Sequence, residues 1–154
     1  MKAFIFDMDG VIVDTQGMHS QAALEAMAEF GIQSTIEETL AYAGTARGTT
    51  YREIAKKRGL ELPIEEISQR KDELFDAAIA RADLQPIAGI PQLLKELRAR
   101  GIQTAIASSS SDAFIGLIVD RLHIRAYFDA LLSGQNLPKS KPDPAIYRLA
   151  AKTL

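Results

Sequence analysis

Two carboxylates and a glycine follow a short apolar run near the start of the chain. Asp7 and Asp9 come directly after Ala3-Phe4-Ile5-Phe6, a run typical of a strand buried on both faces of a parallel sheet. Ligands of open parallel sheets bind beyond the carboxyl ends of the strands, and residues two apart in an extended chain can address the same cavity. The pair therefore predicts a site for nucleophilic or acid–base chemistry. The alternative is a solvated turn, because Asp and Gly are common turn residues.

Two later segments carry groups that suit phosphate chemistry. Four serines, Ser108 to Ser111, end an apolar run and precede a helical pattern, where hydroxyl and N–H groups can hold phosphate oxygens. Helix capping is the alternative reading of the serines. Lys139 and Lys141 lie in a loop broken by prolines, which by itself is typical of solvent-exposed coil. A lysine there can also balance negative charge on a nucleophile and a transferring phosphoryl group.

Composition narrows the classes of partner. The 154 residues are 47% hydrophobic and 25% charged, which is typical of a globular chain that buries a core. The formal net charge of −2 argues against nucleic acid and anionic lipid as partners, and the absence of cysteine excludes thiol chemistry. No run approaches the ~20 apolar residues that span a bilayer. We therefore expect a cytoplasmic protein with a small-molecule substrate and no membrane association.

The secondary structure that the sequence predicts differs between the two halves of the chain. Helical spacing and stop signals predict a helical first half, and alternating strands and helices follow a linker at Asp83–Gly89. The sequence thus predicts an α/β fold, a Rossmann-like parallel sheet core formed by residues 1–14 and 84–154, with an all-helical cap inserted at residues 15–83. The predicted helices are Met18–Phe30 with Thr15 as a cap, Ile36–Tyr42, Thr49–Arg58, Ile64–Ala82, Ile90–Arg100, Asp112–Leu122 and one from Pro144 onward; the later strands are Gln103–Ala107 and Ala130–Ser133.

The segment Asp7-Met8-Asp9-Gly10-Val11 resembles the first motif of the haloacid dehalogenase superfamily, in the branch of β-phosphoglucomutase and small sugar-phosphate phosphatases. The resemblance implies that Asp7 attacks phosphorus to form an aspartyl-phosphate and that Asp9 transfers protons. It also implies a Mg²⁺ ion held by Asp7 and by the backbone carbonyl of Asp9. Ser108 matches the second motif of the superfamily, and Lys141, directly before a proline, matches the third.

The same resemblance extends to the predicted helical cap. His19, Arg47 and Lys71 match that branch in spacing, which implies contacts to the substrate, with Arg47 gripping a phosphate that is not transferred. Ser109 and Ser110 join them as candidate phosphate-binding residues. Each cap residue also has a plainer reading: a polar helix surface for His19, loop charge for Arg47 and a solvated face for Lys71.

The fourth motif of the superfamily, a pair of acids after another core strand, has no counterpart in this sequence. The resemblance implies further strands beside the N-terminal one and more carboxylates for Mg²⁺. We therefore expect weakened metal binding and a chain that is part of a longer protein, monomeric when complete and prone to association when truncated.

Three functions fit these observations. The first is a Mg²⁺-dependent phosphatase of small phosphorylated metabolites, with sugar phosphates as the expected class, acting through an aspartyl-phosphate. The second is a sugar phosphomutase of the β-phosphoglucomutase kind, which uses the same residues. The third is a non-catalytic fragment that binds phosphate or a partner chain without turnover.

Overall fold

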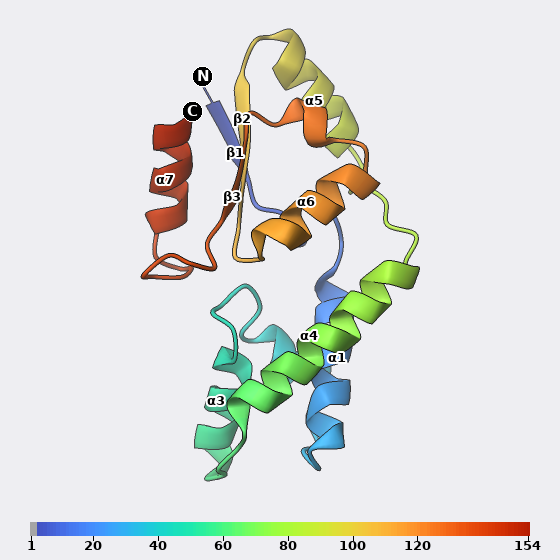
Figure 1. Cartoon of the computed structure of the whole chain (residues 1–154), viewed down its shortest axis with the longest axis vertical. Coiled ribbons are helices and arrows are strands. Elements are labelled where there is room, and N and C mark those ends of the chain that lie inside the picture. The colour runs from blue at the N-terminus through green and yellow to red at the C-terminus, as the bar shows by residue number, and fades with distance from the viewer. Residues whose placement is uncertain (1–2) are drawn as a thin grey trace. The chain divides into compact units, whose positions relative to one another are not determined.

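The computed structural model describes residues 3–154, and the chain divides into two compact units (Figure 1). The first, called here the sheet unit, comprises the described residues up to Asp14 together with Leu84–Leu154. The second, the helical unit, comprises Thr15–Asp83. Each unit has its own hydrophobic core, so each is described by itself.

A parallel three-stranded sheet forms the centre of the sheet unit. The strands β1 (Ala3–Phe6), β2 (Gln103–Ser108) and β3 (Ala130–Ser133) lie in the order β1-β2-β3. In the register, Phe6 pairs with Ile106 and Ser108 pairs with Ser133. All three strands run in the same direction, so their carboxyl ends lie at one edge of the sheet.

Helices cover both faces of this sheet, as parallel strands require. Helix α7 (Ala145–Thr153) lies on one side, and α5 (Ile90–Ala99) and α6 (Asp112–Arg121) lie on the other (Figure 1). Alternation along β2 explains the two layers: Ala105 and Ala107 pack with Ile146 and Ala150 of α7, whereas Ile106 points to the opposite face. A 3₁₀ turn, η1 (Arg125–Tyr127), precedes β3.

Strand β1 lies at an edge of the described sheet and pairs with β2 alone. Phe6 is buried, but Ala3, Phe4 and Ile5 are only half-buried. The expectation of a strand buried on both faces is therefore wrong for its first three residues. The reason is local, because an edge strand has a neighbouring strand on one side only.

The helical unit contains α1 (Gln16–Glu29), α2 (Ile36–Leu40), α3 (Thr49–Arg58) and α4 (Ile64–Arg81). The long helices α1 and α4 pack against each other (Figure 1). Helix α2 contacts α1, and α3 contacts both α2 and α4. Apolar residues at helical spacing meet in one core, which consists of Ala23, Ala26, Met27, Ile32, Tyr51, Ile54 and Ile67.

The predicted elements all occur, with ends that differ by a few residues. Thr15 does precede α1, but its side chain makes no capping hydrogen bond, so the capping interpretation of Thr15 is wrong. Its backbone conformation is αR rather than extended, whereas the residues that cap helices usually adopt an extended conformation. No helix within residues 3–154 is long and apolar enough to cross a membrane.

Candidate active site

The loop after β1 holds Asp7 and Asp9 in a compact turn. Met8, between them, is fully buried, and its carbonyl accepts hydrogen bonds from the backbone N–H groups of Ile12 (2.9 Å) and Val13 (3.3 Å). Gly10 has a φ of 76°, a left-handed conformation that glycine adopts without steric cost. Burial of Met8 therefore fixes the loop while both neighbouring acids remain partly accessible.

Asp7 accepts two hydrogen bonds on a single oxygen. Its Oδ1 accepts from the backbone N–H of Met8 and from the Nζ of Lys141, each at 2.8 Å. The Asp7 side chain is 37% exposed. Among the described residues no donor is assigned to Oδ2, so one oxygen is held and the other is available to a ligand.

Lys141 approaches Asp7 from the loop before α7. Its Nζ also donates to the carbonyl of Ala107 at 3.0 Å and lies 5.2 Å from the ring centre of Tyr147. The Lys141 side chain is only 15% exposed. A partly buried, doubly hydrogen-bonded ammonium is better fixed than a surface lysine, so its charge is localised at Asp7.

The serine turn after β2 contacts Asp9. The hydroxyl of Ser110 donates to Oδ2 of Asp9 at 3.2 Å, and the buried hydroxyl of Ser108 accepts from the N–H of Ser110 at 3.1 Å. Ser133, at the end of β3, donates to the carbonyl of Ser110 at 2.6 Å. These bonds place the end of each strand in one network.

At the carboxyl edge of the sheet the structure thus pairs Asp7 with Lys141 and Asp9 with Ser110. Ser108 joins them through its hydrogen bond with the N–H of Ser110. The side chain of Ser109 makes no hydrogen bond within residues 3–154. Helix α6 is capped by the next serine, Ser111, whose hydroxyl accepts from the N–H of Phe114 at 3.2 Å. The helix cap and the contacts at Asp9 are therefore divided among different serines.

Oxygen ligands at this edge fit a hard cation in part. Within residues 3–154 no three His, Cys, Asp or Glu side chains form a group that could hold a metal by themselves. Mg²⁺, however, usually keeps several waters and takes one or two carboxylates together with phosphate oxygens. The partly accessible carboxylate of Asp7 can supply one such carboxylate, and the backbone carbonyl of Asp9 can supply a further oxygen from the same loop.

In the helical unit, His19 and Lys71 form a pair. The Nζ of Lys71 lies 3.0 Å from Nδ1 of His19, and both groups contact Phe75. The His19 ring stacks on the Phe75 ring at 3.8 Å between centres, and the Lys71 Nζ lies 4.7 Å from the same ring. Because an ammonium only donates, Nδ1 of His19 accepts a hydrogen bond from the Nζ of Lys71 in this contact.

Arg47 is bound by two carboxylates of α4. Its Nε donates to Oδ2 of Asp72 at 2.9 Å and its Nη1 donates to Oε1 of Glu65 at 2.6 Å. Burial alone would lower the pKa of Arg47, but hydrogen bonds to Asp72 and Glu65 outweigh it and raise that pKa. Asp72 also lies 3.5 Å from the Nζ of Lys71, so Arg47 and Lys71 share one carboxylate.

Sequence reasoning missed the two acids that hold Arg47. Glu65 occupies the first turn of α4, where acids are ordinarily explained by the helix dipole, and Asp72 looks like one more charge on a solvated face. Their pairing with Arg47 spans 18 and 25 residues, and no local pattern signals it. Ser133 was likewise missed as a neighbour of the serine turn.

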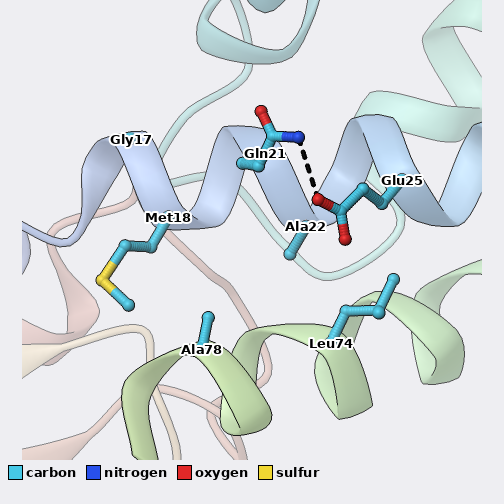
Figure 2. A pocket seen from close by; sticks show the side chains of 7 residues that line it. All are labelled: Gly17, Met18, Gln21, Ala22, Glu25, Leu74 and Ala78. Carbon is cyan, nitrogen blue, oxygen red and sulfur yellow. Dashed lines mark hydrogen bonds between the residues drawn. The ribbon is translucent and has the colours of Figure 1, made fainter. Parts of the chain in front are cut away.

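A pocket of about 220 Å³ opens between α1 and α4 of the helical unit (Figure 2). Met18, Ala22, Leu74 and Ala78 supply much of its lining, and Gln21 donates to Glu25 at one side. None of the predicted site residues lines this pocket. It is therefore separate from the polar groups around His19 and Arg47.

Comparisons with known proteins find similarity over nearly the whole chain. Residues 4–154 match the family model described as haloacid dehalogenase-like hydrolase. The β-phosphoglucomutase of Bacillus subtilis (strain 168) is 33% identical over 162 residues, which cover 100% of this chain and 70% of that enzyme. The fructose-1-phosphate phosphatase YqaB of Escherichia coli (strain K12) is 26% identical over 152 residues, which cover 97% of this chain and 78% of that enzyme.

A solved structure shares the arrangement of elements. The crystal structure of a CbbY mutant from Rhodobacter sphaeroides, in complex with xylulose-(1,5)bisphosphate, superposes with a TM-score of 0.80 at 26% identity. The match covers 99% of this chain and 72% of that one. The α/β class with a helical insertion, predicted from the sequence, is confirmed by this likeness together with the observed sheet.

Proposed function

Because this chain belongs to the haloacid dehalogenase-like hydrolases, in the branch of β-phosphoglucomutase and related phosphatases, we propose that it is a phosphatase of small phosphorylated metabolites. The expected substrates are sugar phosphates. The expected intermediate is an aspartyl-phosphate on Asp7. One relative is named as a fructose-1-phosphate phosphatase, which supports a sugar monophosphate as the substrate class.

The contact between Lys141 and Asp7 is the observation that carries this proposal. A 2.8 Å ammonium–carboxylate contact on one oxygen limits the rotation of Asp7 and leaves its other oxygen to attack, as a nucleophile needs. The same ammonium lies where a transferring phosphoryl group would gather negative charge, so it stabilises the transition state electrostatically. A structural ion pair would not need the second oxygen of Asp7 to stay accessible.

The reaction then divides into two displacements. Oδ2 of Asp7 attacks phosphorus, the bond from phosphorus to the sugar oxygen breaks, and Asp9 gives its proton to that oxygen. Water next attacks the phosphoryl group, Asp9 takes the proton of the water, and the bond from phosphorus to Asp7 breaks. The hydrogen bond from Ser110 keeps the Asp9 carboxyl near the leaving oxygen, and the N–H groups of the serine turn bind phosphate oxygens.

Asp7 and the backbone carbonyl of Asp9 would hold Mg²⁺ in this proposal, together with phosphate oxygens and water. When bound, Mg²⁺ would neutralise charge on the phosphoryl oxygens. Lys141 contributes its positive charge through its hydrogen bond to Oδ1 of Asp7.

The helical unit, Thr15–Asp83, serves as the substrate-binding cap in our proposal. His19, Lys71 and Arg47 supply its polar contacts, with Arg47 binding a phosphate that is not transferred. Ser109 and Ser110 bind the transferred phosphate in the sheet unit. The sugar bisphosphate bound to CbbY supports a ligand with phosphates at both ends.

A sugar phosphomutase is the second candidate. It is favoured by the His19–Lys71 pair, which could orient a sugar hydroxyl, and by the 33% identity to β-phosphoglucomutase. The two functions differ only in the acceptor of the phosphoryl group, which is water in a phosphatase and a sugar hydroxyl in a mutase.

The test is Mg²⁺-dependent release of inorganic phosphate across a panel of sugar phosphates. Asp7→Asn should lower turnover by at least about 10³-fold, because the nucleophile is lost. Asp112→Asn, which also removes one carboxylate but at an exposed position in α6, should retain activity. If Asp7→Asn kept wild-type turnover, the nucleophile assignment would be wrong, and isomerised sugar without free phosphate would identify the mutase.

A further inference from the structure

The guanidinium of Arg47 donates hydrogen bonds to two carboxylates of the helical unit, those of Asp72 and Glu65. We propose that Glu65 and Asp72, called here the Arg47 clamp, compete with a phosphate group for Arg47 and so set how tightly this protein binds a second phosphate. The inference rests on the proposed role of Arg47 in binding phosphate. It adds two residues that lower the affinity for that phosphate.

The two contacts lie on different edges of the guanidinium. Asp72 takes the Nε–H at 2.9 Å and Glu65 takes an Nη1–H at 2.6 Å, while no described residue accepts from Nη2. A guanidinium binds phosphate best through two parallel N–H groups. Nε with Nη2 forms one such pair and Nη1 with Nη2 forms the other, so a phosphate that binds through either pair must compete with Asp72 at Nε or with Glu65 at Nη1.

The backbone of Arg47 is fixed, so the competition concerns its side chain. Arg52 donates from Nη2 to the carbonyl of Arg47 at 2.8 Å. The next residue, Gly48, has a φ of 78°, and a Cβ there would lie 2.9 Å from Ile64 and 3.0 Å from Arg52. Both facts anchor this loop against α3 and α4, so Arg47 responds to ligands by rotating its side chain.

Exposure sets the size of the effect. The side chains of Arg47, Glu65 and Asp72 are 43%, 81% and 46% exposed. Exposed ion pairs are weak, so a dianionic phosphate can displace the clamp carboxylates from Arg47. Each contact that is lost on displacement still lowers the affinity for phosphate. Removing one clamp carboxylate should tighten phosphate binding by about two- to fivefold.

The matched pair of variants is Glu65→Gln and Glu66→Gln. Both remove one exposed acid from the first turn of α4 and so change the helix-dipole interaction equally, but only Glu65 contacts Arg47. The probe is inorganic phosphate at constant ionic strength, followed through the Arg47 Nε–H resonance in NMR. The resonance is assigned from its absence in Arg47→Lys.

We expect phosphate to shift this resonance, with half-saturation at about two- to fivefold lower phosphate in Glu65→Gln than in wild type. The phosphate concentration at half-saturation should equal that of wild type in Glu66→Gln. In Glu65→Asp it should lie close to the wild-type value, because the negative charge is kept. Asp72→Asn provides a second clamp variant. Equal titration of wild type, Glu65→Gln and Asp72→Asn would overturn the inference, as would a resonance that phosphate leaves unmoved.

A kinetic arm separates this inference from the proposed function. In Glu65→Gln, KM for fructose 1,6-bisphosphate should fall relative to KM for fructose 1-phosphate, whereas Glu66→Gln should leave the ratio unchanged. An unchanged ratio in Glu65→Gln would count against the clamp. If no sugar phosphate released phosphate, the proposed function would fail, but the NMR titration would still decide whether the clamp competes with phosphate.

Discussion

One long-range contact joins the loop after β1 to the loop before α7 at the carboxyl edge of the sheet. Lys141 lies 134 residues from Asp7 in sequence, yet its Nζ contacts the carboxylate at 2.8 Å with only 15% of the lysine side chain exposed. Low exposure strengthens a charge–charge interaction compared with a surface pair. The same contact links the two ends of the chain at the proposed nucleophile.

Replacing Lys141 with Gln should lower kcat for phosphate release by about 10²–10³-fold, because a positioned charge at the transferring group is lost. The matched control is Lys139→Gln, since the Lys139 side chain is 76% exposed and its one ion pair within residues 3–154 is with Asp143, at 3.7 Å. Steady-state kinetics on the best sugar phosphate would measure both variants. Equal losses in the two would show that bulk charge, rather than the Asp7 contact, matters.

Residue types and spacing predicted part of the site. Asp7 and Asp9 stood out because they directly follow an apolar run, whereas Lys141 stood out only because its Lys-Pro pair resembles the third motif of the family. The structure places Lys141 on Asp7. Which serine contacts Asp9 was not predictable, since four identical residues differ only in backbone geometry. The Arg47 contacts were missed for a related reason: long-range pairs between exposed charges leave no local sequence pattern.

At the scale of elements, the end of α6 contains a non-glycine residue in a left-handed conformation. His123 has a φ of 56°. Its N–H donates to the carbonyl of Asp120 at 3.1 Å, and the N–H of Ile124 donates to that of Val119 at 2.9 Å. These two bonds form a Schellman motif, in which glycine is the usual residue at the position of His123.

His123→Gly should therefore raise the free energy of unfolding by about 0.5–1 kcal/mol, because glycine adopts this conformation without a Cβ clash. His123→Ala should bring no such gain, since alanine keeps its Cβ. Urea unfolding of the three proteins would measure the difference. Equal stabilisation by Gly and Ala would mean that the imidazole of His123, and not its left-handed backbone, lowers the free energy of unfolding.

The start of α2 predicts a pH dependence of stability. Hydrogen bonds from Ser34, Arg58 and the N–H of Thr35 lower the pKa of Glu38 from 4.5 to about 2. The unfolded chain thus takes up this proton at higher pH than the folded chain. The contribution of the carboxylate is complete above about pH 4.5 and is lost as pH falls toward about 2.

Replacement of Glu38 by Gln should remove this contribution. The loss of stability relative to wild type should be largest above about pH 4.5 and should shrink toward zero as pH approaches 2. Urea unfolding across that pH range would show it, with Glu61→Gln as an exposed control. A stability difference that stayed constant with pH would contradict the lowered pKa of Glu38.

The helices and strands were largely predictable because each has a local signal. Gly59 ends α3 and Pro63 precedes α4, and the expected helices Thr49–Arg58 and Ile64–Ala82 occur there with ends within one residue. The turn η1 was not predicted, because a three-residue 3₁₀ helix has no periodicity. The apolar run alone does not predict the edge position of β1; only the resemblance did, because it implies further strands beside the N-terminal one.

At the scale of the whole molecule, the helical unit and the sheet unit each contain a hydrophobic cluster of their own within the described residues. The core of the helical unit gathers around Ile67, Met27 and Ile54, whereas α7 and β2 form a cluster within the sheet unit. The chain passes between the units only twice, after Asp14 and after Asp83. Regions with distinct cores can open with different free energies.

Ile67→Ala should destabilise the helical unit by about 2–5 kcal/mol, because Ile67 is fully buried and its loss leaves a cavity. Native-state hydrogen exchange should then show lower protection for amides of α1 and α4 with little change in β1–β3. Leu94→Ala, which empties an equally buried position in α5, should give the reverse pattern. Equal loss of protection in both units from either variant would mean that they unfold together, and the two cores would then act as one cooperative unit.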